Sequence, residues 1–184
     1  DRDQAAKYLF FTTRNGIVKR TSTSQFSNIR TNGLKALKLR DGDELINVLR
    51  TSGEDEVIIG THLGYSVRFK GAVVRDMGRA AAGVKGVNLR EGDYVVGTSR
   101  IDDSQEVLVI SENGLGKRTQ ASEYPTKGRG GKGMKVMNVT ERTGKLAGLT
   151  AVNGDEDLMV ITDTGVIIRT NVANISQTGR AAQG

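Results

Sequence analysis

A glycine-rich basic segment of the chain has the residue types that bind phosphate. It runs from Tyr124 to Val136 and has the sequence YPTKGRGGKGMKV. Glycine allows left-handed turns and a close approach of the backbone to a partner. Cationic side chains beside free backbone N–H groups suit an anion such as a phosphate. No acid interrupts the four cations, Lys127, Arg129, Lys132 and Lys135, or the four glycines, Gly128, Gly130, Gly131 and Gly133.

Weaker copies of this segment recur about 50 residues away on either side. The sequences GRAAAG (78–83), GRGGKG (128–133) and GRAAQG (179–184) share the pattern Gly-Arg-x-x-x-Gly, with spacings of 50 and 51 residues. The corresponding stretch near the N-terminus is one residue shorter and contains Arg30 and Gly33. A fixed period of this length indicates a repeat architecture.

A second marker, a glycine that follows a short β-branched or aromatic run, recurs with the same period. Its spacings are 48, 50 and 51 residues, and two of the four turns are Asn-Gly. Asn-Gly between apolar runs is the strongest short signal for a β-hairpin. The four glycines are Gly16, Gly64, Gly114 and Gly165, and the arginines that follow each by four residues are Arg20, Arg68, Arg118 and Arg169.

Each repeat therefore predicts four short strands. A hairpin of two strands leads into the basic glycine loop, then into an alternating third strand, a turn and a fourth strand. The third strand is expected at 34–39, 84–89 and 134–139. Units of this size are typical of propeller-like blades, which must stack to bury both faces. We expect an all-β fold in which residues 1–184 form part of one β-pinwheel domain, with repeats at 8–56, 57–106 and 107–157 and a truncated repeat at 158–184.

The charge of the chain favours an acidic partner. The formal net charge is +6 and the pI is about 9.7, which points first to nucleic acid and second to an anionic membrane surface. Cations and acids are also segregated within each repeat: residues 14–40 contain seven bases and no acid, whereas residues 41–56 contain six acids and one base. Stacked blades would place these cations in a band suited to a long polyanion.

We expect phosphate contacts rather than recognition of base sequence. The chain has no recognition helix, zinc-finger spacing or aromatic RNA-binding motif. Cations on strands and glycine loops position DNA without distinguishing its sequence. The predicted DNA-binding residues are Lys19, Arg20, Arg30, Lys35, Arg68, Lys70, Arg79, Lys85, Lys117, Arg118, Lys127, Arg129, Lys132, Lys135, Arg169 and Arg180, together with the loop glycines Gly128, Gly130, Gly131 and Gly133.

Catalytic chemistry is poorly supported by the sequence. The chain contains no Cys and a single His, His62, which is expected to lie in a surface turn. The segment GRGGKG lacks the spacing and the Ser/Thr of a Walker loop and precedes a strand rather than a helix. We therefore predict no catalytic residue and no metal site, and we expect the tyrosines to have packing roles.

Several of these segments together resemble the C-terminal domain of the DNA gyrase A-subunit family, which belongs to the type IIA topoisomerases. They are RTNGLKALKLRDGDELINV, TSGEDEV, GLGKRTQASEYPTKGRGGKG and VTERTGKLAG, and the resemblance covers essentially the whole chain. The resemblance implies a six-bladed β-pinwheel in which neighbouring blades exchange an outer strand. It also implies that DNA wraps around a positively charged perimeter and that this wrapping supports negative supercoiling by the whole enzyme.

The diagnostic box of that family is Gln-Arg/Lys-Arg-Gly-Gly-Arg/Lys-Gly, and residues 127–133 match it at five of seven positions. The two departures are Lys127, where the family has Gln, and Gly128, where it has a cation. Because the strict box lies in the family's first blade, we expect the chain to contain later blades, roughly the third to fifth and part of the sixth. This part of the domain is expected to bind or bend DNA as a supporting contact.

The resemblance further implies a non-catalytic domain without a cofactor of its own, with ATP and Mg²⁺ bound elsewhere in the parent complex. The implied partners are double-stranded DNA and the remaining gyrase A and B subunits in an A2B2 assembly, without a membrane, in the bacterial cytoplasm at the nucleoid. Two alternatives remain: the C-terminal domain of the topoisomerase IV counterpart, with fewer blades, and a protein-interaction propeller with no role in DNA binding.

Overall fold

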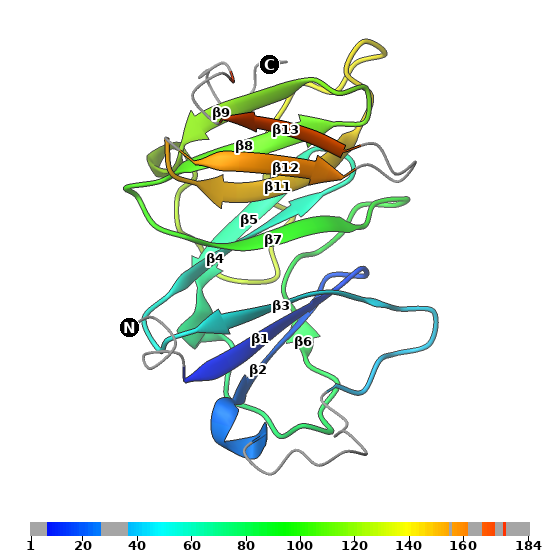
Figure 1. Cartoon of the computed structure of the whole chain (residues 1–184). Coiled ribbons are helices and arrows are strands. Elements are labelled where there is room, and N and C mark those ends of the chain that lie inside the picture. Colours follow the sequence, from blue (N-terminus) through cyan, green and yellow to red (C-terminus); the bar gives the residue numbers. More distant parts are fainter. Residues whose placement is uncertain (1–6, 27–36, 155, 162–166, 172–174, 176–184) are drawn as a thin grey trace.

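The computed structural model describes residues 7–26, 37–154, 156–161, 167–171 and 175, with 157–161 and 167–170 described as backbone only. The described part is built of strands with short 3₁₀ turns (Figure 1). The first two units contain β1 (Tyr8–Thr13), β2 (Ile17–Ser22), η1 (Thr23–Phe26), β3 (Leu45–Thr51), β4 (Glu56–Thr61), β5 (Tyr65–Lys70), η2 (Gly71–Val73), β6 (Val84–Lys85) and β7 (Val95–Ile101). The remainder contains β8 (Glu106–Ser111), β9 (Gly116–Gln120), η3 (Ala121–Glu123), β10 (Met134–Lys135), β11 (Leu146–Val152), β12 (Asp157–Ile161) and β13 (Ile167–Asn171).

Neighbouring units exchange a strand. The sheet orders are β3-β1-β2-β6, β10-β5-β4-β7, β11-β8-β9 and β12-β13. Strand β6 belongs to the second repeat in sequence but pairs with β2 of the first, and β10 of the third repeat pairs with β5 of the second. The expected all-β fold of stacked, strand-exchanged blades is therefore confirmed.

The exchanged third strand is much shorter than the alternating pattern predicts. It spans two residues in β6 and in β10, residues 37–40 form no strand, and 34–36 lie outside the described residues. The chain turns away because the amides of Gly86 and Val87 both donate to Gly16 O, which lies at the hairpin tip of the preceding unit. Side-chain alternation alone does not show where the third strand ends, because its end depends on Gly16, about 70 positions earlier.

The hairpins form where the Gly signal predicts them within the described residues. Gly16, Gly64 and Gly114 have φ values of +86°, +93° and +85°. In each of these hairpins, the hydroxyl three residues before the glycine accepts the backbone N–H of the residue after the glycine. Thr13 Oγ1, for example, accepts from Ile17 N at 3.1 Å. Gly165 lies outside the described residues.

The cores lie between successive blades. Phe10 and Val18 of the first blade pack with Val57, Ile59 and Phe69 of the second. A second cluster joins the second and third blades, with Ile58 and Ile101 packed against residues of the third unit. Because each blade contributes only one small sheet, this sharing of apolar faces is what gives the array a core.

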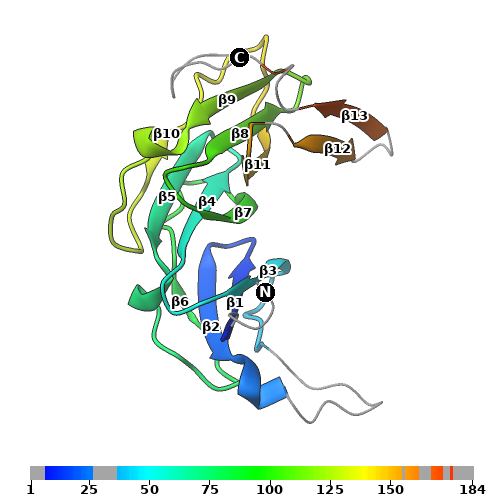
Figure 2. The same ribbon diagram turned by 60° about the vertical axis from the view of Figure 1, so that its left-hand side comes forward.

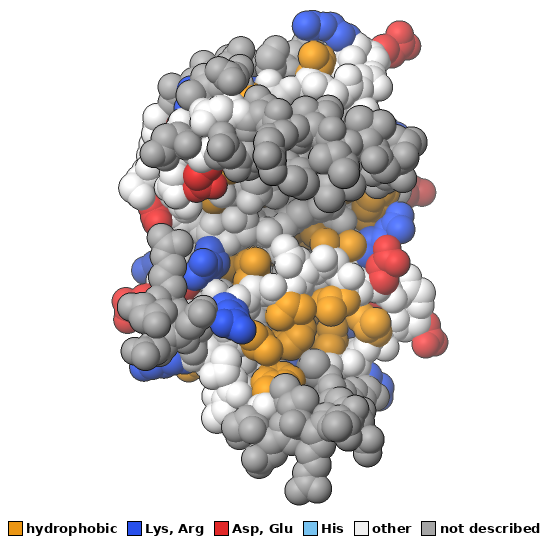
Figure 3. Space-filling model, in the orientation of Figure 1, with side chains coloured by type: hydrophobic (Ala, Val, Ile, Leu, Met, Phe, Trp, Pro, Cys, Tyr) orange, Lys and Arg blue, Asp and Glu red, His pale blue; other side chains and the backbone are white. Residues whose placement is uncertain are grey.

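The stack is curved. Figure 2 shows β3, β7 and β11 toward the inner side of the arc and β5, β10 and the glycine loop on the outer side. Figure 3 shows apolar side chains gathered over the region of β3, where Leu45 and Val48 are exposed. The arc thus presents its loops and exchanged strands outward.

In the motifs at 78–83 and 128–133, the last glycine is required for strand exchange. A Cβ on Gly133 would lie 2.5 Å from Ser66 O, and a Cβ on Gly83 would lie 2.5 Å from Val18 O. Both glycines also have left-handed φ values, +87° and +91°. These residues let the loop approach the preceding blade closely enough for β10 and β6 to pair.

We expect Gly133→Ala to lower the free energy of unfolding by at least about 1–2 kcal/mol, because it combines left-handed strain with a backbone clash. Urea unfolding followed by circular dichroism measures this loss. Gly128→Ala is the matched control, since Gly128 has open space around its Cα and no positive φ, and it should change stability by less than about 0.5 kcal/mol. Equal losses in the two variants would contradict the close-approach role.

Candidate nucleic-acid interface

The basic glycine loop forms an exposed rim on the outer side of the arc (Figure 2). It connects η3 to β10, and Lys127, Arg129, Lys132 and Lys135 are all exposed. A hollow of about 250 Å³ lies between this loop and β5. The loop therefore presents several cations to solvent, and its last glycine, Gly133, lies close to Ser66 of β5.

This loop rests on the third-strand segment of the preceding unit. Gly130 N donates to Gly86 O at 2.7 Å, and Asn88 N donates to Gly131 O at 2.8 Å. The Arg129 guanidinium donates to Lys85 O at 2.9 Å, which brings the exposed Lys85 side chain into the same region. A similar backbone contact joins the first and second units, from Lys38 N to Ala81 O at 3.4 Å. The glycine loops of the second and third units therefore each lie against the third-strand segment of the preceding unit.

In the second and third units the arginine that follows the hairpin glycine is buried or half-buried, and its side chain joins two units. The Arg68 side chain is 3% exposed and forms an ion pair with Glu56 at 3.0 Å. It also donates to Ala121 O and Tyr124 O in the third unit at 2.9 and 3.0 Å. Arg118 repeats this arrangement, with Glu106 Oε1 at 2.7 Å and Ile175 O at 2.8 Å. These contacts make the repeated arginine an inter-blade latch.

The same position in the first unit uses an aromatic partner. Arg20 is buried, and its guanidinium carbon lies 4.0 Å from the centre of the Tyr8 ring. Its carbonyl accepts from Met77 N of the second unit. Arg20 and Arg68 are thus buried beneath the surface that was expected to carry them, and Arg118 is largely withdrawn from it. Their predicted contact with a phosphate does not fit this geometry.

Two of the predicted lysines are also buried. Lys19 and Lys117 are 0% and 1% exposed. The Lys19 ammonium donates to Arg79 O at 2.6 Å and so anchors the glycine loop of the second unit to β2. The sequence pattern predicts these lysines at the surface because lysine is rarely fully buried, but here the loop of the following unit covers Lys19.

Burial and the nearby Arg79 guanidinium lower the pKa of Lys19 from its ordinary value of 10.5. Between the lowered pKa and 10.5 the unfolded chain binds more protons than the folded chain, so stability rises with pH in that interval. We expect the stability of the wild type, relative to Lys19→Met, to increase between about pH 8 and about pH 10.5. Urea unfolding at both pH values measures this difference, and a constant or falling difference would contradict it.

The other predicted cations divide into two groups. Lys70 and Lys85 are exposed and Arg79 is half-buried, so they remain available beside the four loop cations. The predicted residues Arg30, Lys35 and Arg180 lie outside the described residues, as does the side chain of Arg169.

Two arginines that the sequence prediction omitted hold the loops in place. Arg40 Nη2 donates to Gly83 O at 3.1 Å, and Arg90 Nη1 donates to Lys132 O at 2.8 Å. They occupy equivalent positions 50 residues apart. That spacing, compared with the spacing of the glycine loops, is the signal that could have identified them.

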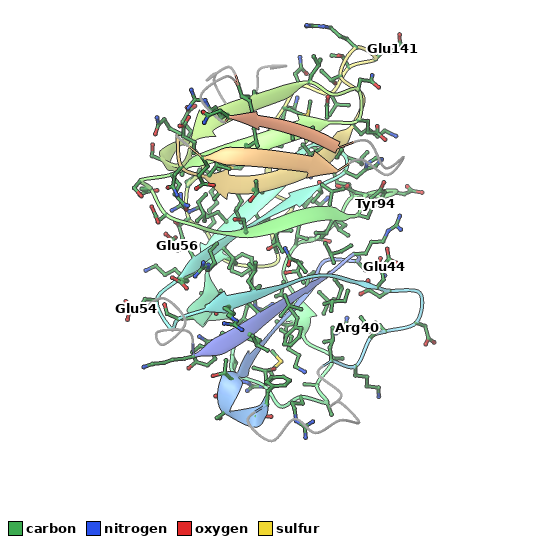
Figure 4. All side chains as sticks on the ribbon, viewed as in Figure 1. Arg40, Glu44, Glu54, Glu56, Tyr94 and Glu141 are labelled. Atoms are coloured by element: carbon green, nitrogen blue, oxygen red, sulfur yellow. The ribbon has the colours of Figure 1, made fainter. Side chains whose placement is uncertain are left out.

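Acidic side chains occupy a different part of the blades. A groove of about 600 Å³ is lined by Glu54, Asp55, Glu56, Asp102 and Glu156 together with residues of β3, β7 and β11. Figure 4 shows Glu54 and Glu56 at the opposite end of the blades from Glu44 and Arg40. Glu56 also reaches the base of the glycine loop, where its carboxylate accepts the Thr126 hydroxyl.

His62 lies in a hairpin turn, as expected, and stacks on Tyr94 with ring centroids 4.3 Å apart. Arg14 lies over Tyr94, 4.1 Å from its centre, and forms an ion pair with Glu44 at 3.4 Å. Figure 4 shows Tyr94 and Glu44 at the same end of the blades. This is a packing role for the histidine and the tyrosine. Among the described residues no group of three or more His, Cys, Asp or Glu side chains could hold a metal ion.

Strand exchange, a period near 50 residues and an outward cationic loop define a pinwheel-type, propeller-like repeat domain. Comparison with known families is more specific, because the model for "DNA gyrase C-terminal domain, beta-propeller" matches residues 7–52, 55–102, 105–153 and 156–184. The chain belongs to this family, and the resemblance seen in the sequence is confirmed. No helix among the described residues is long and apolar enough to cross a membrane.

The relatives agree with this assignment. The chain is 74% identical over 182 residues to the DNA gyrase A protein of Streptococcus pyogenes serotype M3 (strain ATCC BAA-595 / MGAS315), which covers 99% of this chain and 22% of the relative. It is 64% identical over 177 residues to the DNA gyrase A protein of Halalkalibacterium halodurans, covering 96% of this chain and 21% of the relative. The chain thus spans about a fifth of the length of these curated relatives.

Solved structures show the same fold at lower identity. A C-terminal domain of DNA topoisomerase IV superposes with a TM-score of 0.90 at 28% identity, covering 96% of this chain and 56% of that chain. A DNA gyrase A C-terminal domain gives a TM-score of 0.88 at 27% identity, covering 98% of this chain and 60% of that chain. The fold therefore occurs in both enzymes, whereas the high-identity relatives described above are gyrase A proteins.

Proposed function

We propose that this chain binds and bends double-stranded DNA through phosphate contacts along its exposed glycine loops. The observation that carries the proposal is the outward loop 127–135, where four exposed cations lie on a turn pinned to the neighbouring unit. Cations of this kind neutralise phosphates without distinguishing bases. The family membership and the 74% identity to a gyrase A protein support the same function.

The structure narrows the proposed contacts. Burial argues against Lys19, Arg20, Arg68 and Lys117 as surface contacts, and Arg118 is held by Glu106 and Ile175 O. The proposed contacts within the described residues are Lys70, Arg79, Lys85, Lys127, Arg129, Lys132 and Lys135.

We further propose that the chain is a non-catalytic part of a gyrase A protein and contributes to ATP-dependent negative supercoiling by the whole enzyme. In that setting its partners are DNA and the remaining A and B subunits of an A2B2 complex in the bacterial cytoplasm at the nucleoid. ATP and Mg²⁺ would act in other domains of that complex. The identity to gyrase A proteins favours this assignment over topoisomerase IV.

Energy transfer between dyes at the two ends of a duplex tests binding and bending together. We use two duplexes of about 40 bp with unrelated sequences. The proposal predicts an increase in transfer on binding and similar affinities for both sequences, because backbone contacts carry little sequence information. A protein-interaction propeller with no DNA role would bind neither duplex even at low salt, and binding to one sequence alone would contradict the phosphate-contact mechanism.

A further inference from the structure

Arg90 connects the exposed loop of the third unit to the body of the second. Its guanidinium donates to Lys132 O at 2.8 Å and lies over the Tyr65 ring, 3.5 Å from the ring centre. Tyr65 in turn pairs with Lys135 in the strand ladder. Arg90 and Tyr65 therefore contact the glycine loop just before and just after its last glycine, Gly133.

The chemistry of this contact requires arginine. A guanidinium is planar, so it can stack on an aromatic ring and direct an N–H at a carbonyl at the same time, whereas an ammonium cannot do both equally well. Arg40 of the first unit makes a similar hydrogen bond one position further along the loop, to Gly83 O, the counterpart of Gly133. Ile17 occupies the position of Tyr65 there. The stacked arrangement thus belongs to the unit that precedes the most basic glycine loop.

Holding the loop in one conformation before DNA arrives should strengthen phosphate binding by its cations. Lys127, Arg129 and Lys132 lie on a segment with three glycines between them, and glycine loses more conformational freedom on ordering than any other residue. A loop that is already ordered before binding avoids that entropic cost when DNA arrives. The contacts of Arg90, Gly130 N and Asn88 N supply this order in the free protein.

We propose that Arg90, supported by Tyr65, is a positioning residue that preorganises loop 127–133 for phosphate binding. The inference rests on the proposed DNA-binding function, but its structural part is independent of it. Arg90 acts through the loop backbone, so its charge matters less than its shape.

The test uses three variants of the 184-residue chain. They are Arg90→Lys, which keeps the charge, Tyr65→Leu, and the double variant that combines both changes. We expect each single variant to lose roughly threefold to tenfold in duplex DNA affinity with an unchanged salt slope. The double variant should be no weaker than the weaker single variant, because both disrupt one arrangement. Hydrogen exchange at Gly130 N should speed up in all three while exchange in β8 stays the same. The matched control is Arg100→Lys, at an exposed arginine on β7. It should change neither the DNA affinity nor the hydrogen exchange at Gly130 N.

The outcomes separate the alternatives. If Arg90→Lys binds like the wild type while Arg90→Gln loses affinity and lowers the salt slope by about 0.9, Arg90 is an ordinary phosphate contact and the positioning role is overturned. Unchanged exchange at Gly130 in Arg90→Lys would also overturn it. If the wild type does not bind DNA at all, the proposed function fails, and hydrogen exchange alone then decides whether Arg90 and Tyr65 order the loop.

Discussion

Replacing Arg68 with Ala is expected to lower the free energy of unfolding by about 3–5 kcal/mol, the usual cost of removing one partner of a buried ion pair. The side chain is 3% exposed, and its loss leaves the partly buried Glu56 carboxylate without its cation. It also removes the Arg68 donor from Tyr124 O and from Ala121 O, although Ala121 O still accepts from Tyr124 N. Because these acceptors belong to the third unit, the change should weaken the contact between blades as well as the second blade itself.

Urea unfolding of the variant and of Lys70→Ala measures this effect. Lys70 is exposed and ends the same strand, so its removal should cost less than about 0.5 kcal/mol. Arg68→Lys should resemble Arg68→Ala, since an ammonium cannot reach two carbonyls and a carboxylate in one plane. Equal stability of Arg68→Ala and Lys70→Ala would contradict the proposed role of Arg68 in joining two blades. Arg68 would then again be a candidate DNA contact.

The second large effect is expected from removing the exposed loop cations. The variant Lys127→Gln/Arg129→Gln/Lys132→Gln/Lys135→Gln should lose on the order of 10²–10³-fold in duplex DNA affinity at about 0.1 M salt. If each side chain neutralises one phosphate, the salt slope should fall by up to about 3.6, which is four contacts at about 0.9 each. All four side chains are exposed, so the fold should tolerate the change.

A matched control separates the position of the charges from their number. The variant Arg50→Gln/Arg100→Gln/Arg142→Gln/Lys145→Gln also removes four exposed cations, and both variants change the net charge from +6 to +2. The control residues lie on or next to the fourth strand of each unit, away from the glycine loops. If the two quadruple variants lose DNA affinity equally, the affinity depends only on the net charge, and the outward loop is not a preferred DNA contact.

The repeat period and the hairpins were predictable because they depend on local signals. Asn-Gly and the β-branched runs specify turns and strands within a few residues, and the left-handed φ of Gly16 and Gly114 bears this out. Strand exchange was expected only from the family resemblance. It depends on which unit a two-residue strand pairs with, and the pattern around Val84 or Met134 carries no such information.

The predicted DNA contacts are exposed only in part, and the buried ones share one cause. Arg68 and Lys19 were assigned to the surface because such residues are usually exposed. Each is instead covered by a segment about 50–60 residues later in the chain, through Tyr124 O for Arg68 and Arg79 O for Lys19. Their recurrence with the repeat period reflects a repeated structural joint, which a sequence pattern does not distinguish from a repeated binding residue.

The salt dependence of duplex DNA binding by the wild-type chain tests the central claim most directly. Fluorescence anisotropy of a labelled duplex from about 50 to about 300 mM salt gives the slope of log K against log salt. Seven described cations remain as proposed contacts, so we expect a slope between about −3 and about −6, at about 0.9 for each phosphate neutralised. A slope near zero, or no binding at about 50 mM salt, would contradict phosphate binding by the outward loops.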